Sequence, residues 1–267
     1  MGWLPLVWLI ISAVSFHSRN RCAAQVFKKF HLVVAIWSVL LYNKFITLVK
    51  GAACMPSANI FKFETKRKNL YLRVAKGHFA TCNSHSNYYV DVVAQKSRLS
   101  EAKAVAEELC AELRLHTVVD TVLCLDGTEV IGTCLADDLT QADYANMNAH
   151  KSIYVVTPES VNTSQLLFRD NIVPMIEGKH VLILAVSVAT GRTVQAAIEA
   201  VRYYGGEVSG IAAIFATVDE CDGLPVVSVF DPQDLQDYAT YKPSECPLCK
   251  SGVKLDALIN CHGFSKL

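Results

Sequence analysis

The chain has 267 residues, 52% of them hydrophobic and 19% charged, which is enough length for a sizeable core and an apolar composition for a globular protein. Six of the 25 basic residues precede residue 55, so the remainder carries 19 basic and 25 acidic side chains, a net charge of −6. An acidic domain without a basic stripe is a poor nucleic-acid binder, and we exclude nucleic acid as its partner.

The N-terminal segment differs from the rest of the chain. Residues 1–54 contain no Asp or Glu, and the first 16 residues carry no charged side chain. A secretory signal would place basic residues before its apolar run, whereas here Arg19 and Arg21 follow it. A spanning helix needs about 20 apolar residues in succession, and neither apolar run of the segment reaches that length cleanly. We therefore expect an extension outside the working domain, with Met55 as a candidate true start and a membrane anchor as the alternative.

After this extension, the pattern of apolar residues predicts alternating helices and strands. Spacings of three and four residues from Leu99 to Leu113 predict an amphipathic helix, capped by Ser97 or Ser100. The other predicted elements are strands at Val118–Leu125, Ile153–Val156, Val181–Val186, Val208–Thr217 and Val226–Phe230, and helices at Glu129–Leu139 and from about Thr193. This order favours an α/β fold with a mainly parallel sheet flanked by helices and right-handed crossovers.

Two loops follow predicted strands in a way that suits anions. The stretch His180–Gly206 predicts a buried strand, a small-residue loop and a helix ended by glycines. Thr190, Gly191 and Thr193 lie at the start of that helix, where free N–H groups and the helix dipole favour a phosphate. Residues 126–128 (Asp-Gly-Thr) directly follow the predicted strand Val118–Leu125. Ligands of parallel sheets bind outside the carboxyl ends of the strands, so two loops predict two separated phosphates, with ordinary turns as the alternative.

These motifs resemble the type I phosphoribosyltransferases, and most of all their orotate phosphoribosyltransferase branch. In that family the central strand is followed by two acids, two variable residues and Thr-Thr-Gly-Gly-Thr or a close variant. Here Ala185 and Val186 stand where the acids would be, and the loop reads Ala189, Thr190, Gly191, Arg192 and Thr193. A third match covers Leu72–Asp91, and the resemblance extends over Phe61–Phe230.

The resemblance implies transfer of a phosphoribosyl group from phosphoribosyl diphosphate to a pyrimidine or related base, with Mg²⁺ assisting. It implies a phosphate loop for the 5′-phosphate at residues 189–193, and a diphosphate loop formed by Asp126, Gly127 and Thr128. Lys76, in a small N-terminal hood, and Arg169, in a lid, are weaker candidates for substrate contacts. The alternative for Arg169 is an exposed polar hairpin. A homodimer is implied by analogy alone.

The missing acids define an alternative function. In the family the acidic pair contacts the ribose hydroxyls, and neither Ala185 nor Val186 can accept such a hydrogen bond. A non-catalytic sensor of phosphoribosyl diphosphate or of a nucleotide, with the same fold, is therefore the second hypothesis. No catalytic base is assigned, because the reaction in the family depends on activating the electrophile.

Ten cysteines raise the question of disulfides and metal. Without a convincing secretory signal, we expect a reduced state and a cytoplasmic location. Cys246 and Cys249 are separated by two residues and precede a glycine, a pattern that resembles one knuckle of a zinc site. Cys221, Cys261 and His262 are the candidates for its other ligands. A plain turn or a redox pair is the alternative, and a metal-stabilised interaction module is the third hypothesis for function.

The sequence thus predicts three parts: an extension over residues 1–54, a phosphoribosyltransferase-like domain over 55–235 and a Cys-containing tail over 236–267. His78 and His85 lie in a polar segment and are candidates for substrate contacts, against exposed or core histidines as the alternative. Tyr88 and Tyr89 are expected to be packing residues, although one of them could stack on a base.

Overall fold

A computed structural model of the chain describes residues 60–64, 70–141, 146–149, 151–162 and 165–267. The chain divides into two compact units, Met1–Ser57 and Ala58–Leu267. The first unit lies outside the described residues, and with it the candidate start at Met55 and the alternative of a membrane anchor. Among the helices of the described ranges, none is both long and apolar enough to cross a membrane.

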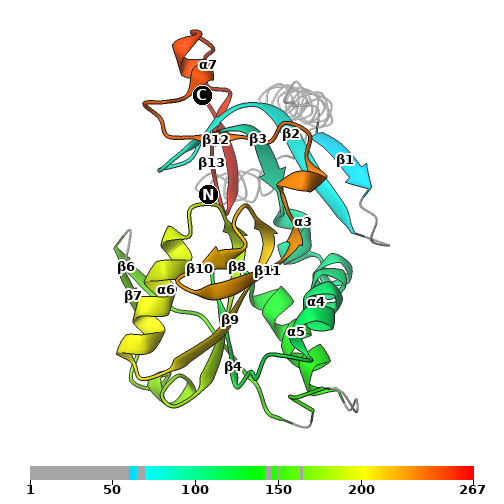
Figure 1. Cartoon of the computed structure of the whole chain (residues 1–267), viewed down its shortest axis with the longest axis vertical. Coiled ribbons are helices and arrows are strands. Elements are labelled where there is room, and N and C mark those ends of the chain that lie inside the picture. Colours follow the sequence, from blue (N-terminus) through cyan, green and yellow to red (C-terminus); the bar gives the residue numbers. More distant parts are fainter. Residues whose placement is uncertain (1–59, 65–69, 142–145, 150, 163–164) are drawn as a thin grey trace, which may run out of the picture. The chain divides into compact units, whose positions relative to one another are not determined.

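A mainly parallel sheet forms the centre of the second unit (Figure 1). Its strands lie in the order β10-β11-β9-β8-β4-β5, and every neighbouring pair is parallel except β10 with β11. The strands are β4 (Thr121–Cys124), β5 (Tyr154–Val156), β8 (His180–Val188), β9 (Glu207–Ala216), β10 (Glu220–Cys221) and β11 (Leu224–Phe230). This arrangement confirms the mainly parallel sheet that the sequence predicts.

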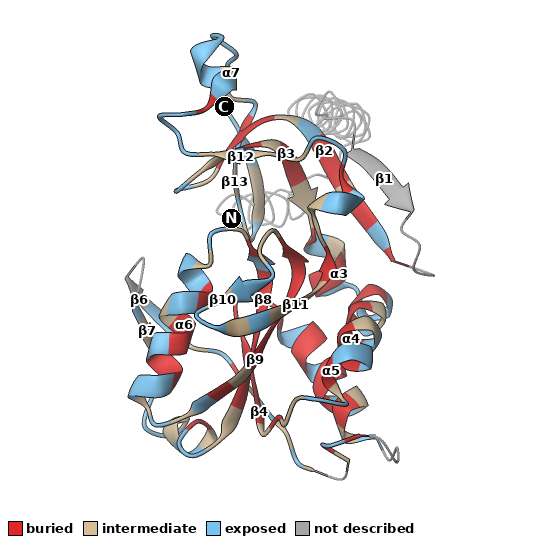
Figure 2. Ribbon diagram, in the orientation of Figure 1, coloured by how far each residue is buried: buried red, intermediate tan, exposed pale blue. Residues whose placement is uncertain are grey.

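Helices pack on both faces of this sheet. The long helices are α4 (Leu99–Leu113), α5 (Glu129–Thr140) and α6 (Arg192–Tyr203). Successive strand residues point to opposite faces, so Leu182 and Leu184 join the core of α4 and α5, whereas Ile183 joins that of α6. The apolar run of β8 is therefore buried on both sides, as Figure 2 shows. The α/β class with flanking helices is confirmed.

The end of α6 follows the prediction from the glycine pair. Gly205 has a φ of +77°, in the left-handed region that favours glycine. The N–H of Gly206 donates to the carbonyl oxygen of Val201 at 2.9 Å, and that of Gly205 to Arg202 at 3.1 Å. These two bonds form a Schellman motif, which satisfies carbonyl groups that the last turn would leave without partners.

The start of α4 differs from the prediction. Its N-cap residue is Arg98, which makes no side-chain hydrogen bond to the helix, so capping by Ser97 or Ser100 is wrong. Ser97 instead ends the short helix α3 (Val93–Ser97), and Ser100 already lies inside α4. Because one residue separates the two helices, neither hydroxyl occupies the extended position that a capping side chain needs.

A second six-stranded sheet, which we call the hood, combines both ends of the described chain. Its order is β12-β3-β2-β13-β14, with β1 also paired to β2. The strands are β1 (Ile60–Glu64), β2 (Tyr71–Ala80), β3 (His85–Asp91), β12 (Thr240–Tyr241), β13 (Ala257–Asn260) and β14 (Gly263–Lys266). The hood is thus more than an N-terminal segment, because β12 pairs with β3 and β13 with β2. The tail completes this sheet.

The remaining elements are short. After β5, two short strands pair with each other in a separate hairpin. Short helices lie before β8, after β11 and in the tail. They are β6 (Glu159–Asn162), β7 (Gln165–Leu167), η1 (Val173–Met175), η2 (Pro232–Asp234) and α7 (Pro247–Lys250).

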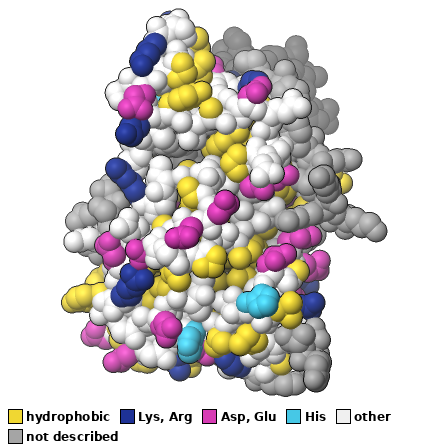
Figure 3. All heavy atoms as spheres, viewed as in Figure 1, with side chains coloured by type: hydrophobic (Ala, Val, Ile, Leu, Met, Phe, Trp, Pro, Cys, Tyr) yellow, Lys and Arg dark blue, Asp and Glu magenta, His cyan; other side chains and the backbone are white. Residues whose placement is uncertain are grey.

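Charged side chains are mixed by sign on the surface. On the face drawn in Figure 3, Asp and Glu are interspersed with Lys and Arg rather than separated from them. A nucleic-acid interface of the usual kind gathers basic side chains on one face or along one helix.

Candidate active site

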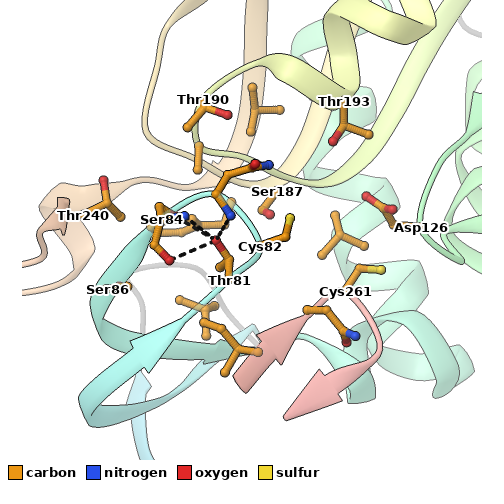
Figure 4. Close-up of a pocket in the computed structure, with 18 of the residues that line it drawn as sticks. Thr81, Cys82, Ser84, Ser86, Asp126, Ser187, Thr190, Thr193, Thr240 and Cys261 are labelled. Carbon is orange, nitrogen blue, oxygen red and sulfur yellow. Dashed lines mark hydrogen bonds between the residues drawn. The ribbon is translucent and has the colours of Figure 1, made fainter. Parts of the chain in front are cut away.

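A cavity of about 610 Å³ lies between the hood and the carboxyl ends of the central strands. Its walls come from the β2–β3 turn, from the loop between β8 and α6, from Asp126 after β4 and from β13 of the tail (Figure 4). Both loops that the sequence predicts to bind phosphates therefore contribute to one cavity. This is the position that parallel α/β sheets use for ligands.

The loop predicted to bind the 5′-phosphate lies at the open N-terminal end of α6. Gly191 has a φ of +71° and is the N-cap of α6. The first bond of the helix runs from the N–H of Gln195 to the carbonyl of Gly191 at 2.7 Å, so the preceding N–H groups lie at the open end of the helix. Thr190 and Thr193 line the cavity beside them (Figure 4). Thr217 fixes the loop by donating its hydroxyl to the carbonyl of Ala189 at 2.9 Å.

Arg192 brings a cation to this loop at a position where the family has glycine. Its side chain lines the cavity, and Nη1 lies 3.5 Å from the Oδ1 of Asn83 in the β2–β3 turn. That turn is held by Thr81, whose Oγ1 accepts the N–H of Ser84 at 2.9 Å, one of the bonds dashed in Figure 4. The guanidinium therefore lies between the phosphate loop and an ordered hood turn.

Of the three residues predicted to form the diphosphate loop, only Asp126 lines the cavity. Asp126 and Gly127 have φ values of +57° and +81°, and the Asp126 carboxylate faces the cavity (Figure 4). Thr128 is fully buried, and its hydroxyl donates to the carbonyl of Leu125 at 2.9 Å. Thr128 thus fastens the loop, while Asp126 is the residue that reaches the cavity.

A lysine that the sequence analysis missed supports this loop. Lys96 is only 8% exposed, and its Nζ donates to the carbonyl of Asp126 and to that of Cys261, both at 2.7 Å. A Cβ placed on Gly127 would lie 3.4 Å from this Nζ, so the ammonium lies directly beside the loop. No sequence motif identifies Lys96, because its second partner, Cys261 in the tail, is more than 160 residues away along the chain.

The positions of the missing acids are confirmed as apolar and buried. Ala185 is 1% exposed and packs on the α6 side, and Val186 is 4% exposed and lines the cavity. The next residue, Ser187, is exposed and directs its hydroxyl into the cavity (Figure 4). Ser187 lies in the variable part of the motif, which is why the resemblance gave it no role.

An aromatic wall closes the hood side of the cavity. Tyr88 and Tyr238 stack with ring centroids 6.2 Å apart, and Phe215 meets Tyr238 edge to face at 5.2 Å. Burial raises the pKa of Tyr238, and burial with the nearby Asp91 raises that of Tyr89 to about 12, so both rings are neutral. Tyr88 and Tyr89 are each 6% exposed, in agreement with their expected packing role, but both also line the cavity.

No protein-family profile matches the chain, but two curated relatives are similar to it in sequence. The orotate phosphoribosyltransferase of Caldanaerobacter subterraneus is 26% identical over 188 residues, which cover 68% of this chain and 88% of the relative. That of Chlorobaculum parvum is 28% identical over 185 residues, with 68% and 86% covered. This chain resembles the orotate phosphoribosyltransferases. The expected phosphoribosyltransferase relationship is thereby confirmed.

Among solved structures, the chain is similar to the orotate phosphoribosyltransferase of Mycobacterium tuberculosis in complex with inorganic phosphate. The two are 22% identical, with a TM-score of 0.41, over 57% of this chain and 83% of that one.

Two weaker candidates for phosphoribosyltransferase substrate contacts lie away from the main cavity. Lys76 is exposed, with its Nζ 5.6 Å from the centroid of the Tyr88 ring, and lines a smaller cavity of about 380 Å³ in the hood. Arg169 bonds to Glu159 through Nε at 2.9 Å and through Nη2 at 2.5 Å. This pair lies at the β6–β7 hairpin and agrees with the alternative of an exposed polar hairpin.

The structure brings two histidines to the cysteine knuckle, in place of the partners that the sequence analysis chose. We call His78, His85, Cys246 and Cys249 the Cys-His cluster, because one donor atom of each lies within 4.8 Å of the others. The expected partners Cys221, Cys261 and His262 are not in it. The reason is that the tail folds back onto β2 and β3, while Cys221 lies beside Gly191 and the carbonyl of Cys261 accepts Lys96.

Proposed function

We propose that this chain binds phosphoribosyl diphosphate in the main cavity and transfers its phosphoribosyl group to a pyrimidine or related base. The observation that carries the proposal is that the predicted phosphate loop and Asp126 of the predicted diphosphate loop line the same cavity. The phosphate loop at the start of α6 provides N–H groups and Arg192, and the diphosphate loop has the Lys96 ammonium beside it. The curated relatives are named for the same reaction with orotate.

Catalysis in this arrangement rests on positioning and charge. The bond between the ribose C1 and the diphosphate oxygen breaks, and its electron pair leaves with the diphosphate. A base nitrogen forms the new bond to C1, and its N–H bond breaks as the proton passes to water. The ribose carries positive charge in the transition state, so the gain comes from holding both reactants and stabilising the leaving group. The phosphate loop would hold the 5′-phosphate, and the diphosphate would lie beside Lys96.

Mg²⁺ fits the donor set that this cavity offers. Mg²⁺ is usually bound through one or two carboxylates together with substrate phosphates and water. Asp126 supplies the only carboxylate among the described residues that line the cavity, and it lies in the diphosphate loop. When bound, the ion would neutralise the leaving diphosphate. Burial and the neighbouring Asp126 raise the pKa of Cys261, which keeps its thiol protonated beside that carboxylate.

The aromatic wall is the part of the cavity that would bind the acceptor heterocycle. Tyr88 and Tyr238 both line the cavity, and a flat base would gain by stacking on an aromatic ring there. Ser86 and Thr240 place hydroxyl groups in the same wall (Figure 4). A planar heterocycle with polar edges is therefore the acceptor that this side of the cavity favours.

A sensor that binds without turnover is the second candidate function. The observation that favours it is the apolar pair Ala185 and Val186, which leaves Ser187 as the polar side chain of this strand in the cavity. One hydroxyl replaces two carboxylates as a partner for the ribose hydroxyls. The same cavity could therefore bind phosphoribosyl diphosphate and retain it unreacted.

Turnover and binding measured on the full chain separate the two functions. Orotate absorbance is followed with phosphoribosyl diphosphate and Mg²⁺, and other pyrimidines are tested by product analysis. Binding of phosphoribosyl diphosphate is measured by calorimetry in parallel. Turnover with any base supports the transferase, and saturable binding without turnover supports the sensor. If the folded protein shows neither, both functions are wrong.

A further inference from the structure

A second group of reactive side chains lies in the hood, apart from the main cavity. The structure assigns a metal site to it: we propose that the Cys-His cluster binds one structural zinc ion, with His78, His85, Cys246 and Cys249 as its ligands. The histidines come from β2 and β3, Cys246 is the N-cap of α7, and Cys249 lies within that helix. The inference does not depend on the proposed phosphoribosyl transfer, because it concerns other side chains.

Four of the six distances between the donor atoms are close to those of a tetrahedral zinc site. His78 Nε2 lies 3.2 Å from His85 Nδ1, 3.5 Å from Cys246 Sγ and 3.6 Å from Cys249 Sγ. Cys249 Sγ lies 3.3 Å from His85 Nδ1. Zinc bonds of about 2.0–2.1 Å to nitrogen and about 2.3 Å to sulfur place tetrahedral ligands about 3.4 Å apart for two nitrogens and about 3.5 Å for nitrogen and sulfur. The donors are therefore spaced to surround one ion.

The unused nitrogen of His78 has the partner that a metal-bound histidine requires. His78 is 1% exposed, and its Nδ1 lies 3.0 Å from the carbonyl oxygen of Val253. A carbonyl accepts, so Nδ1 carries the proton and Nε2 keeps its lone pair toward the cluster. Zinc-bound histidines usually donate their second nitrogen in this way, which fixes both the tautomer and the ring.

The donor set selects zinc among common metals. Two thiolates and two imidazoles suit zinc, whereas Mg²⁺ and Ca²⁺ take oxygen ligands. Four protein ligands leave no position for water or substrate, which is the pattern of a structural site. Cys246 is fully buried, so a bound ion would be shielded on that side.

The local backbone holds the cysteine knuckle in shape without the metal. Cys246 is the N-cap of α7, and its carbonyl accepts the N–H of Lys250 at 3.1 Å. Gly252 has a φ of +77°, and its N–H donates to the carbonyl of Cys249 at 3.0 Å. A glycine after the second cysteine thus closes the turn in the left-handed conformation that other residues rarely adopt.

A close backbone contact places His78 against this knuckle. The N–H of His78 donates to Asp256 Oδ2 at 2.8 Å, and the N–H of Asp256 donates back to the carbonyl of His78 at 2.8 Å. A Cβ on Gly77 would lie 2.6 Å from the same carboxylate oxygen, so a larger residue here would displace the Asp256 side chain. The bulge of β2 between Lys76 and Phe79 lies at this point.

The zinc ion would connect the tail to the main cavity. The tail runs from the knuckle through Asp256 into β13, whose residues Leu258, Ile259 and Asn260 line that cavity. The next residue, Cys261, accepts Lys96 through its carbonyl. We therefore expect the ion to hold one wall of the cavity in place, because it fixes the segment that precedes the wall.

Metal analysis of the full chain tests the proposal without any substrate. We expect about one zinc per chain after purification without chelators, since four-ligand sites of this kind hold zinc tightly. Cys249→Ser and His85→Gln each remove one ligand at the more exposed side of the cluster. Their zinc affinity should fall by more than the roughly 10- to 100-fold that follows loss of an outer hydrogen-bond partner.

Matched variants and a spectroscopic probe complete the test. Cys221→Ser and His262→Gln remove the same residue types outside the cluster and should retain zinc in full. Cobalt(II) bound to the unmodified protein in place of zinc should give the strong visible absorption of a tetrahedral site, with thiolate charge-transfer bands. This measurement does not depend on the folding of any variant. The proposal is overturned by metal-free native protein, by a Cys246–Cys249 disulfide in its place, by a six-coordinate cobalt spectrum, or by equal zinc loss in the matched variants.

Discussion

The Lys96 ammonium lies 2.7 Å from the carbonyl oxygen of Asp126 and 2.7 Å from that of Cys261. One buried cation therefore joins the diphosphate loop after β4 to the tail that completes the hood. Its positive charge also lies beside the position proposed for the leaving diphosphate, where a cation stabilises developing negative charge. Lys96 thus links the stability of the cavity wall to the chemistry proposed in the cavity.

Replacement of this lysine should weaken both stability and diphosphate binding. In Lys96→Met two partly buried carbonyl groups lose their donor, so we expect the free energy of unfolding to fall by about 1–3 kcal/mol in urea titrations. Affinity for diphosphate, measured by calorimetry, should fall about tenfold, equal to roughly 1.4 kcal/mol. Lys103→Met, on the exposed side of α4, is the control and should leave both unchanged. Unaltered diphosphate affinity in folded Lys96→Met would contradict this role.

The glycine of the phosphate loop gives a second prediction. Gly191 has a φ of +71°, and a Cβ there would lie 3.0 Å from the Sγ of Cys221. The left-handed conformation costs a residue with a side chain about 1–2 kcal/mol, so Gly191→Ala should destabilise the protein or move the loop. We expect phosphoribosyl diphosphate to bind at least about tenfold more weakly, measured by calorimetry.

Gly178 provides a control that separates the cost of backbone strain from an effect on the shape of the phosphate loop. Gly178 has a φ of +65° with no atom within 4 Å of a built Cβ, and it does not line the cavity. Gly178→Ala should therefore lose a similar amount of stability and keep its ligand affinity. If the two variants bind phosphoribosyl diphosphate equally well, Gly191 does not shape a phosphate site.

The central sheet could be predicted because its signals are local. The apolar run of β8 and the glycines after α6 each report on neighbours within a few residues, and both predictions are confirmed. The boundaries were less accurate, since β8 continues two residues past Val186 to Val188. Hydrogen bonds to β9, which periodicity does not report, extend the strand there.

The parts that could not be predicted depend on contacts across the whole chain. His78 lies 168 residues before Cys246, and the two meet because the tail pairs with the hood through β12 with β3 and β13 with β2. Lys96 occupies a short helix without a motif, and Tyr238 lies in a segment beyond the resemblance. Sequence patterns identify residue types for a site, but a distant strand pairing decides which of them meet.

A buried ion pair between the hood and α4 gives a prediction on pH. Arg73 of β2 donates to both carboxylate oxygens of Glu101, at 2.6 and 2.7 Å, with side chains 15% and 11% exposed. The hydrogen bonds from Arg73 hold the pKa of Glu101 below its usual value. A carboxyl with a lowered pKa in the folded state stabilises the protein above the unfolded pKa of about 4.3, and this contribution is lost as the pH falls through the folded pKa.

Glu101→Gln should remove that pH dependence. Above about pH 5 we expect a loss of about 1.5–3 kcal/mol in the free energy of unfolding, the range for hydrogen bonds to charged groups. The difference from the native protein should shrink as the pH falls below about 4, in urea titrations across this range. Glu159→Gln is the control, because the Arg169–Glu159 pair has similar geometry but is exposed and should show no measurable change. A constant difference at every pH would exclude titration of Glu101 as the cause.

The missing acids allow a gain-of-function prediction at Val186. Val186 lines the cavity and also packs in the core of α4 and α5, whereas Ala185 packs on the α6 side and does not line the cavity. Only the former position can therefore bring a carboxylate to the ligand. In the orotate branch the acids at these positions contact the ribose hydroxyls, and hydrogen bonds to a charged acceptor contribute about 1.5–3 kcal/mol. We expect Val186→Asp to bind phosphoribosyl diphosphate about tenfold more tightly with Mg²⁺ and to raise any turnover with orotate. Val186→Asn, which lacks the charge, should gain less. Weaker binding in folded Val186→Asp would show that the ribose does not lie over this strand end.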